Sequence, residues 1–218
     1  MIIALDGPAG AGKSTVAKAV ARELGLFYLD TGAMYRAVTL AVLERGVDPS
    51  ASEACARVAH EVALDFDEAG CVRVDGRPGE PDIRSRTVTR NVSAVSAHAD
   101  VRTAVVALQR ALAEARGGLV AEGRDTTTVV FPDADHKFFL NASQEERARR
   151  RARQEAATSD AYETILADIA RRDRLDSTRT HSPLVRSPEA IEIESDEMSA
   201  DEVVAEILER IRVRSTRG

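Results

Sequence analysis

The chain has 218 residues, of which 44% are hydrophobic and 30% are charged. This composition is typical of a globular protein and excludes an intrinsically disordered chain. The 30 basic and 36 acidic residues give a formal net charge of −6, which argues against a protein that binds nucleic acid through its overall charge. No run of uncharged apolar residues is long enough for a membrane span, so we expect none.

Two further features indicate the compartment. The first residues, MIIALDGPAG, have no basic segment ahead of an apolar one, so we expect no secretory signal. Cys55 and Cys71 are too few for a disulfide framework, and no C-x-x-C pair suits zinc. A cytoplasmic protein is therefore expected.

The first half of the chain begins with a short apolar run at 2–5, which predicts a buried strand. Helical spacing follows, with a glycine at each of two predicted helix ends and a capping box of Ser50 and Glu53 ahead of a third helix. The helices predicted in this half are 13–24, 33–45, 51–62 and two within 84–116, broken near 98–100. Alternation and a Gly/Pro-rich exit at about 63–84 predict a small inserted hairpin unit.

The second half returns to short strands that alternate with helices. The predicted strands lie in LVAEGRD (119–125), HKFFLNA (136–142) and AIEIE (190–194). Capping boxes of Ser143 with Glu146 and of Ser199 with Glu202 predict two helix starts, and 160–175 is also helical. This alternation predicts an α/β fold with a doubly wound parallel sheet, as one domain of 1–218 that carries the insert and a helical lid at about 143–158.

The segment after the first strand matches the phosphate-loop pattern G-x-x-x-x-G-K-[ST] and lies between a strand and a helix, as that motif requires. Glycines let successive N–H groups point at phosphate oxygens, and the helix start adds its positive dipole end. We expect Lys13 to reach the β- and γ-phosphates, Ser14 to ligate Mg²⁺ and Thr15 to bind the α-phosphate. The predicted ATP contacts are Gly7, Pro8, Ala9, Gly10, Ala11, Gly12, Lys13, Ser14 and Thr15.

Other motifs separate three classes of phosphate-loop protein. A regulatory GTPase needs an Asn/Thr-Lys-x-Asp element, and none of the three lysines lies in one. An ATPase motor needs an apolar strand that ends in Asp-Glu, which is absent from the sequence. A kinase for a small phosphorylated acceptor needs arginines, since guanidinium groups bind phosphate bidentately and stay charged. Such arginines follow the predicted turns: Arg36, Arg124, Arg147, Arg150, Arg172 and Arg179.

These stretches together resemble the bacterial cytidylate kinases, which belong to the phosphate-loop nucleoside monophosphate kinases. The matching segments are DGPAGAGKST (6–15), LDTGAMYRA (29–37), SAVSAHADVR (93–102), EGRDTTTVVFPDA (122–134), NASQEERARRR (141–151) and RRDRLDSTRTHSPL (171–184). The resemblance implies reversible phosphoryl transfer from MgATP to CMP or dCMP in pyrimidine metabolism. It also implies that Thr127, where the family has a glycine, would be strained if that position requires a positive φ.

The resemblance also implies a role for each matching residue. Arg36, Arg124 and Arg179 would bind the phosphate of the acceptor. Ser93, Arg102 and Asp125 would bind cytosine, with a further contact from Thr31. Arg172 and Asp176 would hold the sugar and help to bridge the phosphates. The implied catalytic residues are Lys13, Arg124, Arg172 and Arg179, while Arg147 and Arg150 on the lid would contact ATP and Arg149 and Arg153 would face solvent.

Two alternatives remain open on the sequence. The first is a kinase for another small acceptor, such as UMP, dTMP or a non-nucleotide phosphate ester. The second is a nucleotide-binding regulator without transferase activity, which would leave the arginines at 36, 124, 172 and 179 unexplained. We expect a monomer whose partners are small molecules, because no exposed apolar stripe stands out.

Overall fold

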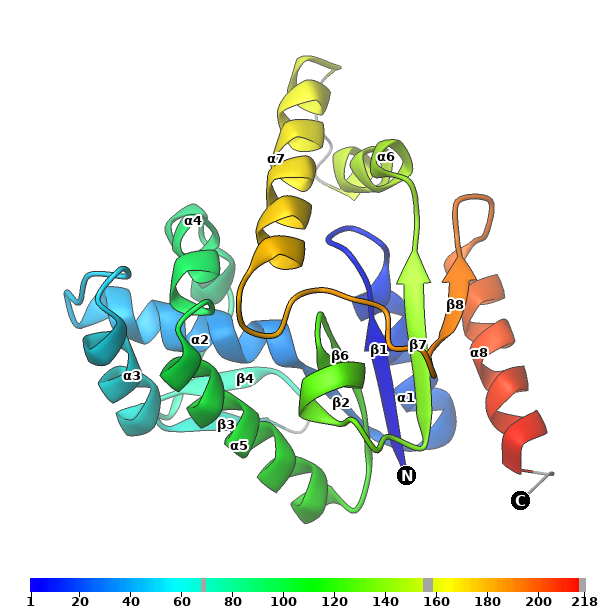
Figure 1. The fold of residues 1–218 in the computed structure, drawn as a ribbon, viewed down its shortest axis with the longest axis horizontal. Coiled ribbons are helices and arrows are strands. Elements are labelled where there is room, and N and C mark those ends of the chain that lie inside the picture. Colours follow the sequence, from blue (N-terminus) through cyan, green and yellow to red (C-terminus); the bar gives the residue numbers. More distant parts are fainter. Residues whose placement is uncertain (68–69, 155–158, 216–218) are drawn as a thin grey trace. The chain divides into compact units, whose positions relative to one another are not determined.

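The fold was obtained as a computed structural model that describes residues 1–67, 70–154 and 159–215 (Figure 1). The chain divides into two compact units. Unit 1 comprises Met1–Tyr28 and Gly118–Gly218, and unit 2 comprises Leu29–Gly117. The hairpin expected at 63–84 thus lies inside a larger unit, and the last residues of the lid expected at 143–158 lie outside the described residues.

A parallel sheet forms the centre of unit 1. Its strands are β1 (Ile2–Asp6), β2 (Phe27–Asp30), β6 (Leu119–Gly123), β7 (His136–Asn141) and β8 (Ile191–Glu194). Their order across the sheet is β2-β6-β1-β7-β8, and the chain passes into unit 2 along β2. β1 pairs in parallel with β6 and β7, and β7 pairs in parallel with β8, so the predicted parallel α/β sheet is confirmed.

Helices cover the strands of unit 1. They are α1 (Lys13–Leu24), α6 (Gln144–Gln154), α7 (Ser159–Thr178) and α8 (Ala200–Ser215). The core packs apolar side chains of β1 and β7 against α1 and α8, including Leu5, Phe138, Val20, Val203 and Ile207. Full burial of each such side chain contributes about 1.5–3 kcal/mol, which holds the strand ends in place. The first helix buries Val16, Ala17, Val20 and Ala21, as its spacing predicts.

The ends of the helices test the capping predictions. Gly25 adopts a left-handed conformation after α1, and the reciprocal box of Ser199 and Glu202 is confirmed. The box of Ser143 and Glu146 is half formed, because the Glu146 N–H donates to Ser143 Oγ while the Glu146 carboxylate binds arginines. The box predicted at Ser50 is wrong: Ser50 donates to Asp48, and the third helix has no side-chain cap.

Unit 2 is mostly helical. Its elements are α2 (Thr31–Glu44), α3 (Ser52–Glu61), β3 (Leu64–Phe66), β4 (Val72–Val74), β5 (Arg77–Pro78), the short 3-10 helix η1 (Asp82–Arg84), α4 (Arg86–Val95) and α5 (Ala99–Arg116). The three strands form an antiparallel sheet in the order β3-β4-β5, which agrees with the predicted hairpin. The helix break predicted near 98–100 is confirmed, since α4 ends at Val95 and α5 begins at Ala99.

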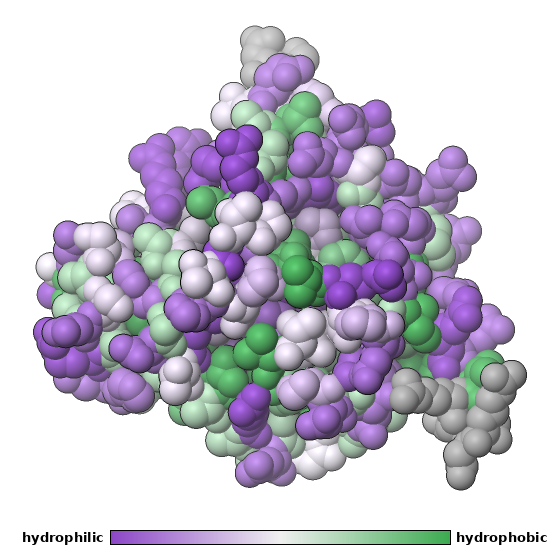
Figure 2. Space-filling model, viewed as in Figure 1, coloured by the Kyte–Doolittle hydropathy of each residue, from purple (hydrophilic) through white to green (hydrophobic). Residues whose placement is uncertain are grey.

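On the face shown in Figure 2, hydrophilic side chains are widespread and apolar side chains lie between them. The exposed large hydrophobic residues of the described chain come from separate segments: Met1, Leu108, Leu175, Val185, Ile191 and Val213. Among the described residues, no helix combines the length and the apolar character that crossing a bilayer requires.

Candidate active site

Three loops of unit 1 begin at one edge of its parallel sheet. Asp6, the last residue of β1, is in register with Gly123 on β6 and with Phe139 on β7. The loop 7–12 therefore starts beside the segment that follows β6, and the start of α6 follows β7 at the same edge. Ligands of open α/β sheets bind at this carboxyl edge.

The loop 7–12 lies close to the neighbouring strand. A Cβ atom on Gly7 would lie 2.1 Å from the backbone oxygen of Leu140, so only glycine fits there. Gly12 has φ 94° and is the N-cap of α1, a left-handed conformation that glycine adopts without strain. The loop thus turns directly into the start of α1, where unpaired N–H groups and the helix dipole favour a phosphate group.

Lys13 is buried at the base of this loop, with 5% of its surface exposed. Its Nζ donates to the backbone oxygen of Pro8 at 2.9 Å. Burial, together with the nearby Arg124 guanidinium, lowers the pKa of Lys13 to about 7, although the carboxylates of Glu122, Asp6 and Asp176 oppose the shift. The loop therefore holds an ammonium group whose charge is costly until an anion reaches it.

This pKa predicts a pH-dependent affinity for ATP. Because Lys13 is half deprotonated near pH 7, a polyphosphate that needs the ammonium must draw in a proton at higher pH. We expect the Kd for ATP to rise between pH 7 and pH 9, with net proton uptake in calorimetric titrations run in two buffers of different ionisation enthalpy.

A Lys13→Arg variant is the matched control, because its guanidinium stays charged throughout this range. Its ATP affinity, though weaker, should be independent of pH above 7 and should involve no such uptake. An equal Kd at pH 7 and pH 9 in the unmodified protein would contradict the prediction.

Side chains with oxygen atoms that could bind a metal ion lie together at the start of α1. Ser14 Oγ donates to Glu122 Oε1 at 2.5 Å, and the Tyr28 hydroxyl donates to the same oxygen at 3.2 Å. Glu122 is 5% exposed and is the residue before the last one of β6, beside the loop. A hydroxyl and a carboxylate are hard ligands of the kind that Mg²⁺ takes together with substrate phosphates. The residues present therefore fit that ion, although the described residues contain no cluster of three or more His, Cys, Asp or Glu side chains that could bind a metal alone.

Asp6 connects the phosphate loop to the segment after β6. Its fully buried carboxylate accepts the backbone N–H and hydroxyl of Thr126 at 2.9 and 2.7 Å, and the corresponding groups of Thr127 at 2.7 and 2.6 Å. Burial raises the pKa of Asp6, although these hydrogen bonds oppose the shift. The four bonds tie the π-helical turn Thr126–Val130 to the end of β1.

Thr127 is not strained. Among the described residues other than glycine, only Asp75 and Ser182 have a positive φ. The condition for strain at this position, a positive φ, is therefore not met, and the Thr127 N–H and hydroxyl both bind Asp6.

Four predicted acceptor residues pair with one another in unit 1. Arg124 Nε donates to Asp176 Oδ2 at 2.8 Å, and Arg179 NH2 lies 3.7 Å from Asp125 Oδ1. Burial alone would raise the pKa of Asp176, but Arg124, with Arg172 and Arg179, lowers it on balance. Asp125 is only 4% exposed. These charges come from the end of β6 and from α7 and the loop after it, so the fold gathers segments about 50 residues apart.

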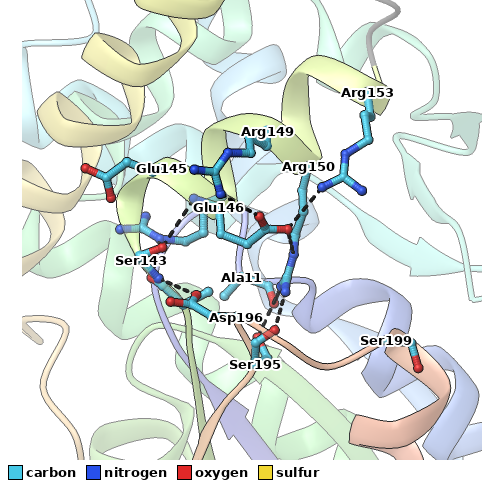
Figure 3. A network of polar contacts seen from close by, with 12 residues as sticks. Ala11, Ser143, Glu145, Glu146, Arg149, Arg150, Arg153, Ser195, Asp196 and Ser199 are labelled. Atoms are coloured by element: carbon cyan, nitrogen blue, oxygen red, sulfur yellow. Dashed lines mark hydrogen bonds and ion pairs between the residues drawn. The ribbon is translucent and has the colours of Figure 1, made fainter.

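The lid arginines divide into two kinds. Arg147 and Arg150 lie against the phosphate loop and donate to its backbone carbonyls. Arg149 and Arg153 are 58% and 71% exposed and pair with Glu146, so the predicted solvent-facing role is confirmed (Figure 3). Direct contact of Arg147 and Arg150 with ATP stays a prediction.

The remaining predicted residues lie in unit 2. Arg36 donates to Thr89 Oγ1 at 2.9 Å and to the Ile83 backbone oxygen at 3.3 Å. Arg102 is 4% exposed, and its guanidinium lies over the Tyr35 ring, 5.1 Å from its centre. Thr31 is buried at the start of α2, and Ser93 is half-buried on α4. Unit 2 therefore fixes the side chains of Arg36 and Arg102 through neighbouring elements of its own.

Several residues of unit 1 and unit 2 escaped the sequence analysis: Asp6, Tyr28, Tyr35 and Asp173. Asp6 and Asp173 stand inside quoted motifs, directly before the phosphate loop and directly after Arg172, so their position was a usable signal. Tyr35 likewise stands inside a quoted motif, directly before Arg36, whereas Tyr28 carried no such signal, because nothing in a single sequence separates it from core aromatics.

The sequence of this chain is similar to those of known proteins over nearly its whole length. A family model described as cytidylate kinase matches residues 3–213. This chain belongs to the cytidylate kinase family. A cytidylate kinase of Mycolicibacterium paratuberculosis is 48% identical over 220 residues, covering 99% of this chain and 96% of that protein. A bifunctional pantoate ligase/cytidylate kinase of a Synechococcus strain is 50% identical over 220 residues. This match covers 98% of this chain and 44% of that protein.

Solved structures support the fold alone. A shikimate kinase from Bacteroides thetaiotaomicron has a TM-score of 0.50 at 14% identity, covering 97% of this chain and 98% of that one. An uncharacterized protein from Eubacterium ventriosum has a TM-score of 0.53 at 12% identity, covering 97% and 98% of the two chains. The cytidylate kinase fold of this chain is thus shared with kinases of distant sequence.

Proposed function

We propose that this chain transfers the γ-phosphoryl group of ATP to CMP, giving ADP and CDP reversibly, and that dCMP is also an acceptor. One observation carries the proposal beyond family membership. The phosphate loop with Lys13 follows β1, and Arg124, which pairs with Asp176 of α7, follows the adjacent parallel strand β6, so unit 1 offers separate cationic groups to two phosphates.

The donor is held by the phosphate loop. We assign the loop N–H groups, Lys13, Ser14 and Thr15 to the phosphates of ATP, supported by the burial of Lys13 and the exposure of Ser14 and Thr15 at the start of α1. Ser14 and Glu122 would hold Mg²⁺, which when bound offsets charge on the phosphates. Ser14 donates to Glu122, so the hydroxyl is oriented by the carboxylate.

The acceptor phosphate would bind guanidinium groups. From unit 1 these are Arg124 and Arg179, and from unit 2 Arg36. Asp176 would accept hydrogen bonds from the ribose, and Arg172 would bridge the phosphates. The arrangement supports these roles because Arg124 is already oriented by Asp176, which lowers the conformational entropy lost on binding.

Cytosine offers an exocyclic amine, a ring nitrogen and a carbonyl. Asp125 can accept from the amine, while Ser93 and Arg102 can donate to the acceptors, and Thr31 is a further contact. Arg179 lies beside Asp125, whose carboxylate oxygens can only accept hydrogen bonds. A carboxylate at this place would favour cytosine over uracil, whose carbonyl replaces the amine.

The chemistry needs no general base from the protein. The attacking phosphate oxygen of CMP is ionised near neutral pH, so catalysis consists of aligning the two phosphates and stabilising the charge of the transferring group. Lys13 and the arginines supply that charge from fixed positions, which is worth more than the same charge in water.

An acceptor panel tests the proposed function. In a coupled ADP-release assay we expect kcat/KM for CMP to exceed that for UMP, dTMP and AMP by about 10,000-fold, the order expected where a site built to hydrogen-bond a substrate group meets an analogue that lacks it. An Asp125→Asn variant should reduce the ratio of CMP to UMP while leaving KM for ATP nearly unchanged. Preference for another acceptor would replace CMP in the proposal, and ATP binding without acceptor-dependent ADP release would indicate a regulator.

The proposal also covers the location of the protein, its partners and its oligomeric state. We place the protein in the cytoplasm, with small-molecule partners, and its net charge of −6 argues against nucleic acid as a partner. The scatter of exposed large hydrophobic side chains over separate segments supports a monomer.

A further inference from the structure

The carbonyl side of the phosphate loop is bound by cationic side chains. A loop whose N–H groups turn toward an anion directs carbonyl oxygens the other way, because the two groups of a planar trans peptide unit point in opposite directions. The oxygens of Ala9 and Ala11 accept from Arg147 NH1 at 2.9 Å and from Arg150 NH1 at 3.3 Å. Lys13 binds a third oxygen, that of Pro8.

Arg147 is held rigidly for this contact. Its side chain is 4% exposed, its Nε donates to the Ala142 oxygen at 2.9 Å, and both terminal nitrogens bind Asp173, at 3.1 and 2.7 Å. A Cβ atom on Gly10 would lie 3.2 Å from the Arg147 Cβ, and Gly10 itself has φ 81°. The glycine therefore lets α6 approach the loop closely enough for Arg147 to reach Ala9.

Arg150 is held by a second set of contacts (Figure 3). Its Nε donates to Glu146 Oε1 at 3.2 Å, its NH1 donates to Ser195 Oγ at 3.1 Å, and its NH2 donates to the Ser195 backbone oxygen. Ser195 is 1% exposed and binds the Asn141 oxygen through its N–H and its hydroxyl, at 2.9 and 3.0 Å. Ala11 is thus tied through Arg150 to the ends of β7 and β8.

We propose that Arg147 and Arg150 are positioning residues that hold the phosphate loop from its carbonyl side, with Asp173 and Ser195 as their anchors. The inference rests on the proposed function in that it takes this loop to be the ATP site. It differs from a direct lid contact with ATP, because the guanidinium groups act on the loop backbone.

The anchor at Asp173 gives this arrangement a second consequence. Asp173 follows Arg172 and lies three residues before Asp176 on α7. The pair of Arg147 and Asp173 therefore joins the loop that holds the donor to the helix that carries two proposed acceptor residues. Loss of Asp173 should weaken the binding of both nucleotides.

Binding measurements separate positioning from direct contact. A distorted loop loses affinity for every nucleotide polyphosphate, whereas a direct contact with the γ-phosphate acts on ATP and leaves ADP unaffected. We expect Arg150→Met and Asp173→Asn each to raise the Kd of ATP and of ADP by the same factor, about tenfold for a lost charge-assisted hydrogen bond. Arg149→Met, on the same helix but exposed, should change neither value.

The choice of variants keeps the test decisive. Arg147→Met removes a buried side chain and the cationic partner of Asp173, so it can unfold the protein. Asp173→Asn keeps an oxygen acceptor for Arg147, so this variant and Arg150→Met carry the test, each with circular dichroism to verify folding. A higher Kd for ATP with an unchanged Kd for ADP, or no change in either Kd, would overturn the inference. Titrations need no turnover, so failure of the wild type to phosphorylate CMP would contradict the proposed function separately.

Discussion

Replacement of Lys13 with Ala is expected to lower kcat for CMP phosphorylation by about 1,000-fold, the order seen when one preorganised charge-stabilising group is removed. Lys13 is buried at the base of the loop, where its charge acts in a desolvated setting. The same burial lowers its pKa to about 7, so the fold does not favour the ammonium, and its removal should cost little stability. Steady-state kinetics with CMP and ATP, together with thermal unfolding, measure both effects.

Lys18→Ala is the matched control for this variant. Lys18 is exposed on the same helix, with its ammonium 5.2 Å from the centre of the Tyr28 ring, and its loss should leave kcat within about twofold. An unchanged kcat in the Lys13 variant would contradict the assignment of the loop to phosphoryl transfer. A loss of folding in that variant would contradict the stability argument.

Replacement of Arg124 with Met is expected to lower kcat/KM for CMP by about 1,000-fold, as for other arginines that stabilise phosphoryl transfer. Arg124 is oriented by Asp176 at 2.8 Å, and its side chain is 19% exposed, so its charge is both fixed and partly desolvated. The Kd of ATP should change by less than about threefold, because the loop 7–12 keeps its contacts. Arg124→Lys should recover only part of the activity, since an ammonium cannot bind phosphate bidentately.

Two further variants serve as controls for this prediction. Arg124→Met leaves Asp176 with fewer cationic neighbours, so an Arg124→Met/Asp176→Asn double variant removes that uncompensated charge while still lacking the guanidinium. Arg174→Met, an exposed arginine on α7, should behave as the wild type. Equal losses of affinity for ATP and CMP in the Arg124 variant would assign Arg124 to the fold and not to the acceptor.

Local interactions were the most predictable from the sequence. The phosphate loop, the Gly25 end of α1 and the box of Ser199 and Glu202 each depend on residues a few positions apart, so a short pattern contains the whole interaction. The box predicted at Ser50 failed for the same kind of reason, because the hydroxyl found a nearer acceptor in Asp48.

Contacts between residues far apart in the sequence were harder to predict. The motif that contains Asp6 was recognised, but its four hydrogen bonds come from Thr126 and Thr127, about 120 residues away. The replacement of glycine at 127 suggested strain when taken alone. With Asp6 beside it, the same residue supplies two hydrogen-bond donors to a buried carboxylate.

By itself, the sequence determined the phosphate-loop chemistry, the alternation of strands and helices and the family, because each is encoded in contiguous residues or in their period. Only the tertiary structure decided which polar side chains face one another: Arg124 with Asp176, Arg147 with Asp173 and Arg150 with Ser195. Such pairs depend on the order of parallel strands and on the close approach that Gly7 and Gly10 permit. These packing properties involve the whole chain, and no local pattern specifies them.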